Sequence, residues 1–185
     1  MVFRRRPPPG PLAAVDPDAL PPGLRTPVVD AQRAHAQFAG LVAGLPDGPL
    51  RTRLGELGER VDAGVLAIWR TASQAAAIER VTASLDPDRV TAELKEARRT
   101  GADPSVTDAL QERFASIQRL LNARDEMGAK LPVLEARLAT AVARTAELTL
   151  ATPQVADREL ARVSDEFDSL VGELDALHAA TAELA

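Results

Sequence analysis

Two histidines, His35 and His178, are the side chains of this sequence that titrate nearest neutral pH and bind metals most readily. Asp175 and His178 are three residues apart, so on a helix they would share one face. Carboxylate-bridged metal sites use this spacing, but they also need a second such pair and further glutamates on facing helices. The sequence offers one pair, so we predict no metal site and interpret His178 as a solvent-facing residue.

The other reactive groups argue against catalysis. The sequence has no cysteine and no tyrosine, which excludes thiol nucleophiles, thiolate metal sites and disulfides. It also has no phosphate-binding or calcium-binding loop. The densest acidic group, Asp165-Glu166-Phe167-Asp168, is typical of a solvated helix face around one apolar residue. We therefore expect a protein that is not an enzyme and that has no catalytic residues, no cofactor and no small-molecule substrate.

The net charge of −5 is spread unevenly along the chain. Residues 1–25 carry four arginines against two aspartates, whereas residues 152–185 carry two arginines against eight acidic residues. In the body of the chain, residues 26–151, positive and negative side chains alternate. A nucleic-acid surface needs clustered Lys and Arg, so no nucleic-acid partner is expected. The opposite charges of the two segments predict a weak, salt-sensitive attraction between them.

Prolines and helix formers define the predicted elements. Seven of the fourteen prolines fall in residues 1–25, which predicts an extended or disordered arm. Alanine, leucine, glutamate and arginine dominate the rest of the chain and favour helix. Thr26-Pro27 is typical of a helix start, so the first helix is expected at 26–45. We interpret residues 26–185 as one helical-bundle or coiled-coil domain.

Apolar residues at three-four spacing predict further helices at 49–100, 104–151 and 156–184. Asp86-Pro87 interrupts the first of these, either as a kink or as a tight turn that folds residues 87–100 back. At about 1.5 Å per residue the two long segments have similar lengths, and only three residues join them. The sequence thus predicts an all-α fold: a long antiparallel helical hairpin, or coiled coil, with two shorter helices packed on its base to form a four-helix bundle.

Small and helix-breaking residues inside the predicted helices also need a reason. Gly55, Gly58 and Gly64 each cost a helix up to about 1 kcal/mol relative to alanine, which indicates close packing or a soft segment. Pro132 removes one backbone hydrogen bond and presses on the carbonyl of Gly128. Gly128 and Pro132 therefore predict either a fitted kink or a hinge.

The N-terminal arm contains the candidate contact residues for an anionic partner, Arg4, Arg5 and Arg6. Each could contribute about 1 kcal/mol at an anionic membrane surface, and Pro7 to Pro11 could instead form a polyproline II ligand. No apolar run suits a signal peptide or a bilayer span. A cytoplasmic location is expected, with peripheral attachment at the inner face of the membrane as the alternative.

The predicted hairpin with shorter flanking helices, from Pro49 through Ala185, resembles in layout the phage-shock protein A and ESCRT-III-like membrane-remodelling proteins. Those proteins usually begin with an amphipathic membrane helix, where this chain has a proline-rich segment. The alanine-rich, arginine-over-lysine composition is similar to that of helical proteins from high-GC bacteria. We expect a structural or adaptor protein that acts through helix-to-helix contacts with a protein partner or with itself as a homo-oligomer. The alternative is a peripheral membrane-surface protein that uses the basic arm.

Overall fold

The computed structural model describes residues 10–149 and 153–182, and these residues form helices joined by short connections. The α-helices are α1 (Pro22–Gly44), α2 (Pro49–Ser84), α3 (Pro87–Thr100), α4 (Pro104–Leu148) and α5 (Pro153–Ala182). Two short 3-10 helices, η1 (Pro11–Ala14) and η2 (Pro17–Ala19), precede them. No strand occurs among the described residues, and the prediction of an all-α fold is confirmed.

Every one of the five α-helices begins with a proline, at residues 22, 49, 87, 104 and 153. Proline suits the first helical position because the amide hydrogen it lacks has no partner within the helix there. Aspartates cap two of these starts: the Asp86 carboxylate accepts from the Arg89 amide at 3.2 Å, and that of Asp103 accepts from the Ser105 amide at 2.8 Å. Helix starts in this protein are therefore fixed by local chemistry.

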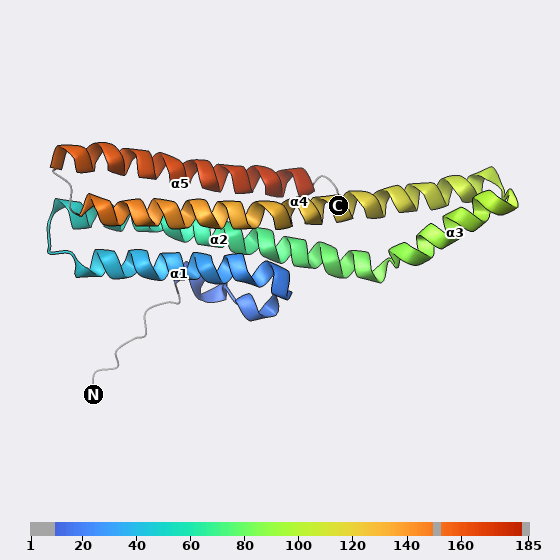
Figure 1. The fold of residues 1–185 in the computed structure, drawn as a ribbon, viewed down its shortest axis with the longest axis horizontal. Helices are drawn as coiled ribbons and strands as arrows, with labels where there is room; N and C mark the ends of the chain where they lie inside the picture. The colour runs from blue at the N-terminus through green and yellow to red at the C-terminus, as the bar shows by residue number, and fades with distance from the viewer. Residues whose placement is uncertain (1–9, 150–152, 183–185) are drawn as a thin grey trace, which may run out of the picture.

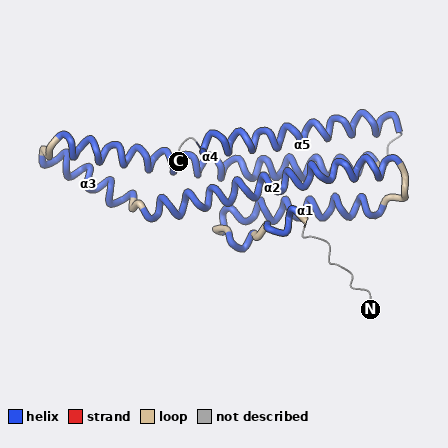
Figure 2. The backbone as a smooth tube through the Cα atoms, turned by 180° about the vertical axis from the view of Figure 1, so that it is seen from behind, coloured by secondary structure: helices blue, strands red, loops and turns tan. Residues whose placement is uncertain are grey.

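The arrangement is an elongated hairpin with a thick base and a thin tip (Figure 1). Helix α4 packs antiparallel to α2 in the base and against α3 toward the tip. Helices α1 and α5 both contact α2 and α4, and they lie on opposite sides of that pair (Figures 1 and 2). The base is thus four helices thick, whereas the tip consists of two.

The break at Asp86-Pro87 is a change of direction within one arm of the hairpin. Asp86 adopts a left-handed backbone conformation with φ 51°, and α3 then continues away from the base to the tip (Figure 2). The hairpin turn itself lies at residues 101–103, where Gly101 has φ 65° and the Ala102 amide donates to the Ala97 carbonyl. The alternative in which residues 87–100 fold back on α2 does not occur.

The main core lies in the base and is aliphatic apart from Phe38 and Phe167. In α5 it contains the predicted stripe Val163, Phe167, Leu170, Leu174 and Leu177. On the hairpin it ends at Ala76 of α2 and at Met127 of α4. The tip has a separate set of buried apolar residues: Val90, Leu94, Ala97, Ile117 and Ala123. The base and the tip are therefore stabilised by different packing.

The prediction of an extended or disordered arm over residues 1–25 is wrong for residues 10–25. These residues form η1, η2 and the first turn of α1, which begins at Pro22 and not at Thr26. Val15, Leu20 and Leu24 are buried in the main core. The reason is that proline weakens only hydrogen-bonded structure, and apolar side chains between prolines still pack wherever a neighbouring surface is available.

Polar contacts also hold this N-terminal segment. Gln32 of α1 donates to the carbonyl oxygen of Val15 at 3.4 Å, and the Arg25 guanidinium donates to the carbonyl oxygens of Asp18 and Leu20. Pro27, expected at the first position of the helix, lies inside α1 and is buried. Residues 1–9 lie outside the described part of the chain.

Candidate interaction surface

The titratable side chains that the sequence singled out form contacts between helices. Nε2 of His35 on α1 lies 2.9 Å from Oδ1 of Asp62 on α2, and both side chains are about two-thirds buried. Oδ1 of Asp175 lies 3.8 Å from the guanidinium of Arg70 on α2. His178, expected to face solvent, is half-buried. The described residues contain no group of three or more potential metal ligands.

The acidic group on α5 is largely the solvated face that we predicted, because Asp165 and Asp168 are exposed. Phe167 is fully buried, as its place in the apolar stripe requires. Glu166 pairs with Arg144 of α4, and Oδ2 of Asp168 lies 2.8 Å from the Arg60 guanidinium of α2. Asp165 is exposed. The flanking acids are partly solvated, but two of them also connect α5 to its neighbours.

This pattern extends along α5 from Asp157 to Asp175. Five arginines on α2 and α4 pair with carboxylates of α5: Arg53 with Asp157, Arg60 with Asp168, Arg70 with Asp175, Arg137 with Glu173, and Arg144 with Glu166. Such exposed pairs contribute at most about 1 kcal/mol each, so the apolar stripe contributes most of the stability and the charges fix the register. These acids are therefore already engaged within the fold, which weakens the predicted attraction to the N-terminal arginines.

The outer face of α4 is different in character. Seven of its exposed residues between 129 and 146 are uncharged: Ala129, Pro132, Val133, Ala136, Thr140, Ala143 and Ala146. Arg137, at the edge of this face, is the one charged residue that is exposed in the same range. Val133 is 58% exposed, the largest value among the exposed large hydrophobic residues of the described chain. We call the seven uncharged residues the α4 outer face.

A groove runs between the α4 outer face and α5. It has a volume of about 720 Å³. The buried side chains of Phe167, Leu170 and Ala141 form its floor, and Pro132, Val133 and Ala136 line its α4 side. Arg137, Arg144 and Glu166 supply charged groups at its walls. Apolar floor, small side chains and a charged border together suit the side chains of another helix.

The predicted hinge residues occupy a distinctive place. Helix α4 is continuous through Pro132, which is exposed, and a Cβ atom on Gly128 would meet no atom within 4 Å. Gly128 follows directly after Met127, where the main core ends. The two residues therefore lie where the four-helix base gives way to the tip, and a hinge there stays a prediction.

Arg4, Arg5 and Arg6 lie outside the described residues, so their role as an anionic contact stays a prediction. No helix of the described chain is both long enough and apolar enough to span a bilayer. Because residues 10–25 pack on the fold, the appropriate test is flotation with anionic vesicles using the full chain and a chain that lacks only residues 1–9. Equal flotation of the two would exclude the arm as a membrane contact.

Comparisons of the chain with protein-family models, with curated proteins and with solved structures give no match. The layout resemblance to phage-shock protein A and ESCRT-III-like proteins therefore stays a prediction. The α4 outer face itself was not predicted, although it has a sequence signal. Ala129, Val133, Ala136, Thr140 and Ala143 repeat at four and three residues beside the buried stripe, so they form a second uncharged stripe on the same helix.

Proposed function

We propose that this protein is a non-enzymatic structural or adaptor protein that acts through helix-to-helix contacts, and that the α4 outer face receives a helix of a partner protein. The observation that carries the proposal is that every exposed residue of α4 from 129 to 136 and from 140 to 143 is uncharged. The described surface of α5, by contrast, carries acidic and basic residues along its length.

Small side chains support a helical partner in particular. Alanine and threonine let two helix backbones approach closely, and the groove beside them leads to the apolar floor at Phe167 and Leu170. The ion pairs Arg137–Glu173 and Arg144–Glu166 border this groove. Charges at the border of an apolar patch select the register of a partner more than they add affinity.

The test is site-specific photo-crosslinking in the cells that make the protein. A photo-reactive residue replaces Val133 on the α4 outer face, and a control replaces Arg158, which is exposed on α5. We expect a discrete adduct from position 133 and none from position 158. Ala136→Arg should remove the adduct while circular dichroism shows an unchanged fold, because Ala136 is exposed. An absent adduct, or the same adduct from position 158, would overturn the proposal.

A further inference from the structure

The tip of the hairpin is left with less cover than the base. In the base, α1 and α5 cover the α2–α4 pair from both sides, and the main core ends at Ala76 and Met127. Beyond those residues the chain continues as two helices, α2 and then α3 on one side and α4 on the other (Figure 2). A two-helix section buries one seam only, so apolar residues beside that seam remain partly in water.

Such residues occur on both helices of the tip. On α4, Phe114 and Leu121 are half-buried and lie seven residues apart, which places them along one side of the helix. On the other arm, Val81 is 50% exposed. Val106, close to the hairpin turn, is 49% exposed. The tip therefore presents more aliphatic surface than two helices can bury between them.

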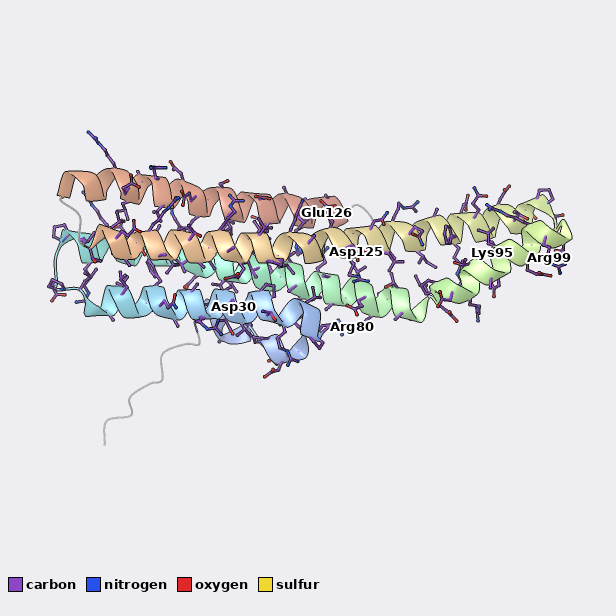
Figure 3. The ribbon with its side chains drawn as sticks, in the orientation of Figure 1. Asp30, Arg80, Lys95, Arg99, Asp125 and Glu126 are labelled. Carbon is purple, nitrogen blue, oxygen red and sulfur yellow. The ribbon has the colours of Figure 1, made fainter. Side chains whose placement is uncertain are left out.

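Charges at the tip lack the cross-helix ion pairs found in the base, although Arg98 donates to Oε1 of Gln111 at 3.2 Å and Arg113 donates to the carbonyl oxygen of Leu85 at 3.3 Å. The carboxylate pairs of the tip join residues within one helix, such as Arg89 with Glu93 and Arg99 with Glu96. Among the described residues of the tip, five basic side chains have no carboxylate partner: Arg80, Lys95, Arg98, Arg113 and Arg119. Six acidic side chains there have no basic side chain as a partner: Glu79, Asp86, Asp88, Asp103, Asp108 and Glu112. Figure 3 shows Arg80 and Lys95 along this part of the hairpin, with Arg99 near the turn.

A surface with nearly equal numbers of positive and negative groups that lack an oppositely charged partner is complementary to a second copy of itself. In a two-fold pair each basic residue of one copy can meet an acidic residue of the other, and the reverse contact follows by symmetry. A partner of one dominant charge would leave half of these groups unpaired. Charge balance thus favours a second copy of this chain over an acidic or basic ligand.

The available area is also sufficient. The tip extends over about 23 residues of α4, or about 35 Å, and two helices packed about 10 Å apart present a face about 20 Å wide. The face is then about 700 Å² on each copy, close to the roughly 800 Å² per partner of a specific interface. We propose that the tips of two copies pack side by side in a two-fold homodimer, which extends the four-helix cross-section of the base through the tip.

This dimer does not depend on the proposed use of the α4 outer face, which lies in the base. It would place the two outer faces at opposite ends of one elongated particle. A dimeric adaptor could then join two partner molecules at a fixed separation. The experiments below use tip positions only, so their failure would leave the proposal for the base untouched.

The first experiment is sedimentation equilibrium of the full chain from low to high micromolar concentration. The expected mass rises from 19.6 kDa toward twice that value. Val81→Glu combined with Val106→Glu should weaken the dimer by at least about tenfold, because it places unpaired charges within an apolar contact. Both side chains are half-exposed, so the monomer should stay folded. Val133→Glu is the matched control, since Val133 is 58% exposed but lies in the base, and it should dimerise like the parent.

The second experiment exploits the absence of cysteine from the sequence. Single cysteines are introduced at Ala109 in the tip or at Ala143 in the base, both of which are exposed. Oxidation should give a disulfide-linked dimer from position 109 in far greater yield than from position 143. The proposal is overturned if the parent stays monomeric at all concentrations, if the Val81 and Val106 variant dimerises like the parent, or if position 143 cross-links as well as position 109.

Discussion

Gly64 of α2 lies directly against Leu138 of α4. A Cβ atom on Gly64 would lie 3.1 Å from Leu138 Cδ1 and 3.6 Å from Leu170 Cδ2, so the glycine lets α2, α4 and α5 approach closely. Gly58 would make an ordinary contact of 3.5 Å with Phe38, and Gly55 would meet nothing within 4 Å. Close packing, one of the two explanations that the sequence offered for these glycines, therefore accounts for Gly64 alone.

Alanine substitutions should separate these glycines. Gly55→Ala should raise the free energy of unfolding by up to about 1 kcal/mol, because alanine is the better helix former and the site is open. Gly64→Ala gains the same propensity but pushes on the fully buried Leu138, and overpacking costs about 1–3 kcal/mol. Gly64→Ala should thus be less stable than Gly55→Ala by at least about 1 kcal/mol in chemical denaturation. Equal gains would show that the core yields freely at Leu138.

Aspartate substitutions along α4 should distinguish base from tip. From the sequence, Leu120 and Leu134 have equal places in the seam, but Leu134 is 1% exposed and Leu120 is only half-buried. Leu134→Asp should lower the free energy of unfolding by at least about 4 kcal/mol, through lost packing and an unpaired buried carboxylate. Leu120→Asp should cost clearly less. Val133→Asp, at an exposed position beside Leu134, is the control. Its free energy of unfolding should lie within about 0.5 kcal/mol of the parent value.

Glu135 should make stability depend on pH. Burial raises the pKa of its carboxyl, the negative charge of Asp30 on α1 raises that pKa further, and Arg33 partly offsets the shift. A carboxyl with a raised folded-state pKa binds its proton more tightly in the folded chain, so its ionisation lowers stability. The cost is absent below the unfolded-state pKa of about 4.3 and grows as the pH rises through the folded-state pKa.

The corresponding variant is Glu135→Gln, which removes the charge at all pH values. Its melting temperature should exceed that of the parent at neutral pH, and the difference should close as the pH falls to about 4. Glu147→Gln, at an exposed residue of the same helix, is the control for the loss of one negative charge. A Glu135→Gln advantage that persists unchanged at acidic pH would contradict the assigned cause.

Pro132→Ala tests the kink against the hinge. The alanine amide can donate to the Gly128 carbonyl, so the helix should gain stability of up to about 3 kcal/mol if its path is unchanged. Pro104→Ala is the control, because proline at the first position of α4 costs no helical hydrogen bond. If the residue is a hinge, small-angle scattering or dimerisation should change while helix content is kept. Loss of the fold would contradict both interpretations.

Charge reversal tests whether the ion pairs between α5 and its neighbours fix the register of α5. Arg144→Glu and Glu166→Arg should each lower stability by up to about 1 kcal/mol, and the double exchange should restore much of the loss. Arg158→Glu, at an exposed residue of α5 that has no ion pair with another described residue, controls for the change in net charge. If thermal unfolding shows no coupling between positions 144 and 166, the register is set by the apolar stripe alone.

Local features of the sequence determined where the helices begin and which sides of them are apolar. Pro49 and Pro104 predicted helix starts because proline fits the first turn and disrupts later ones. Gly101 and Asp103 predicted the hairpin turn through left-handed and capping conformations. The three-four spacing predicted the buried stripe of α5 from Val163 to Leu177.

The tertiary structure alone decided how many neighbours cover each apolar side. Periodicity does not distinguish Leu134 in a four-helix section from Leu120 in a two-helix section, because burial depends on segments distant in sequence. The packing of Val15 and Leu20 among prolines, and the pairing of α5 acids with arginines more than 20 residues away, depend on the same distant contacts. The spacing of apolar residues specifies on which side of a helix they lie. Which helix packs against that side depends on how the connections place the helices.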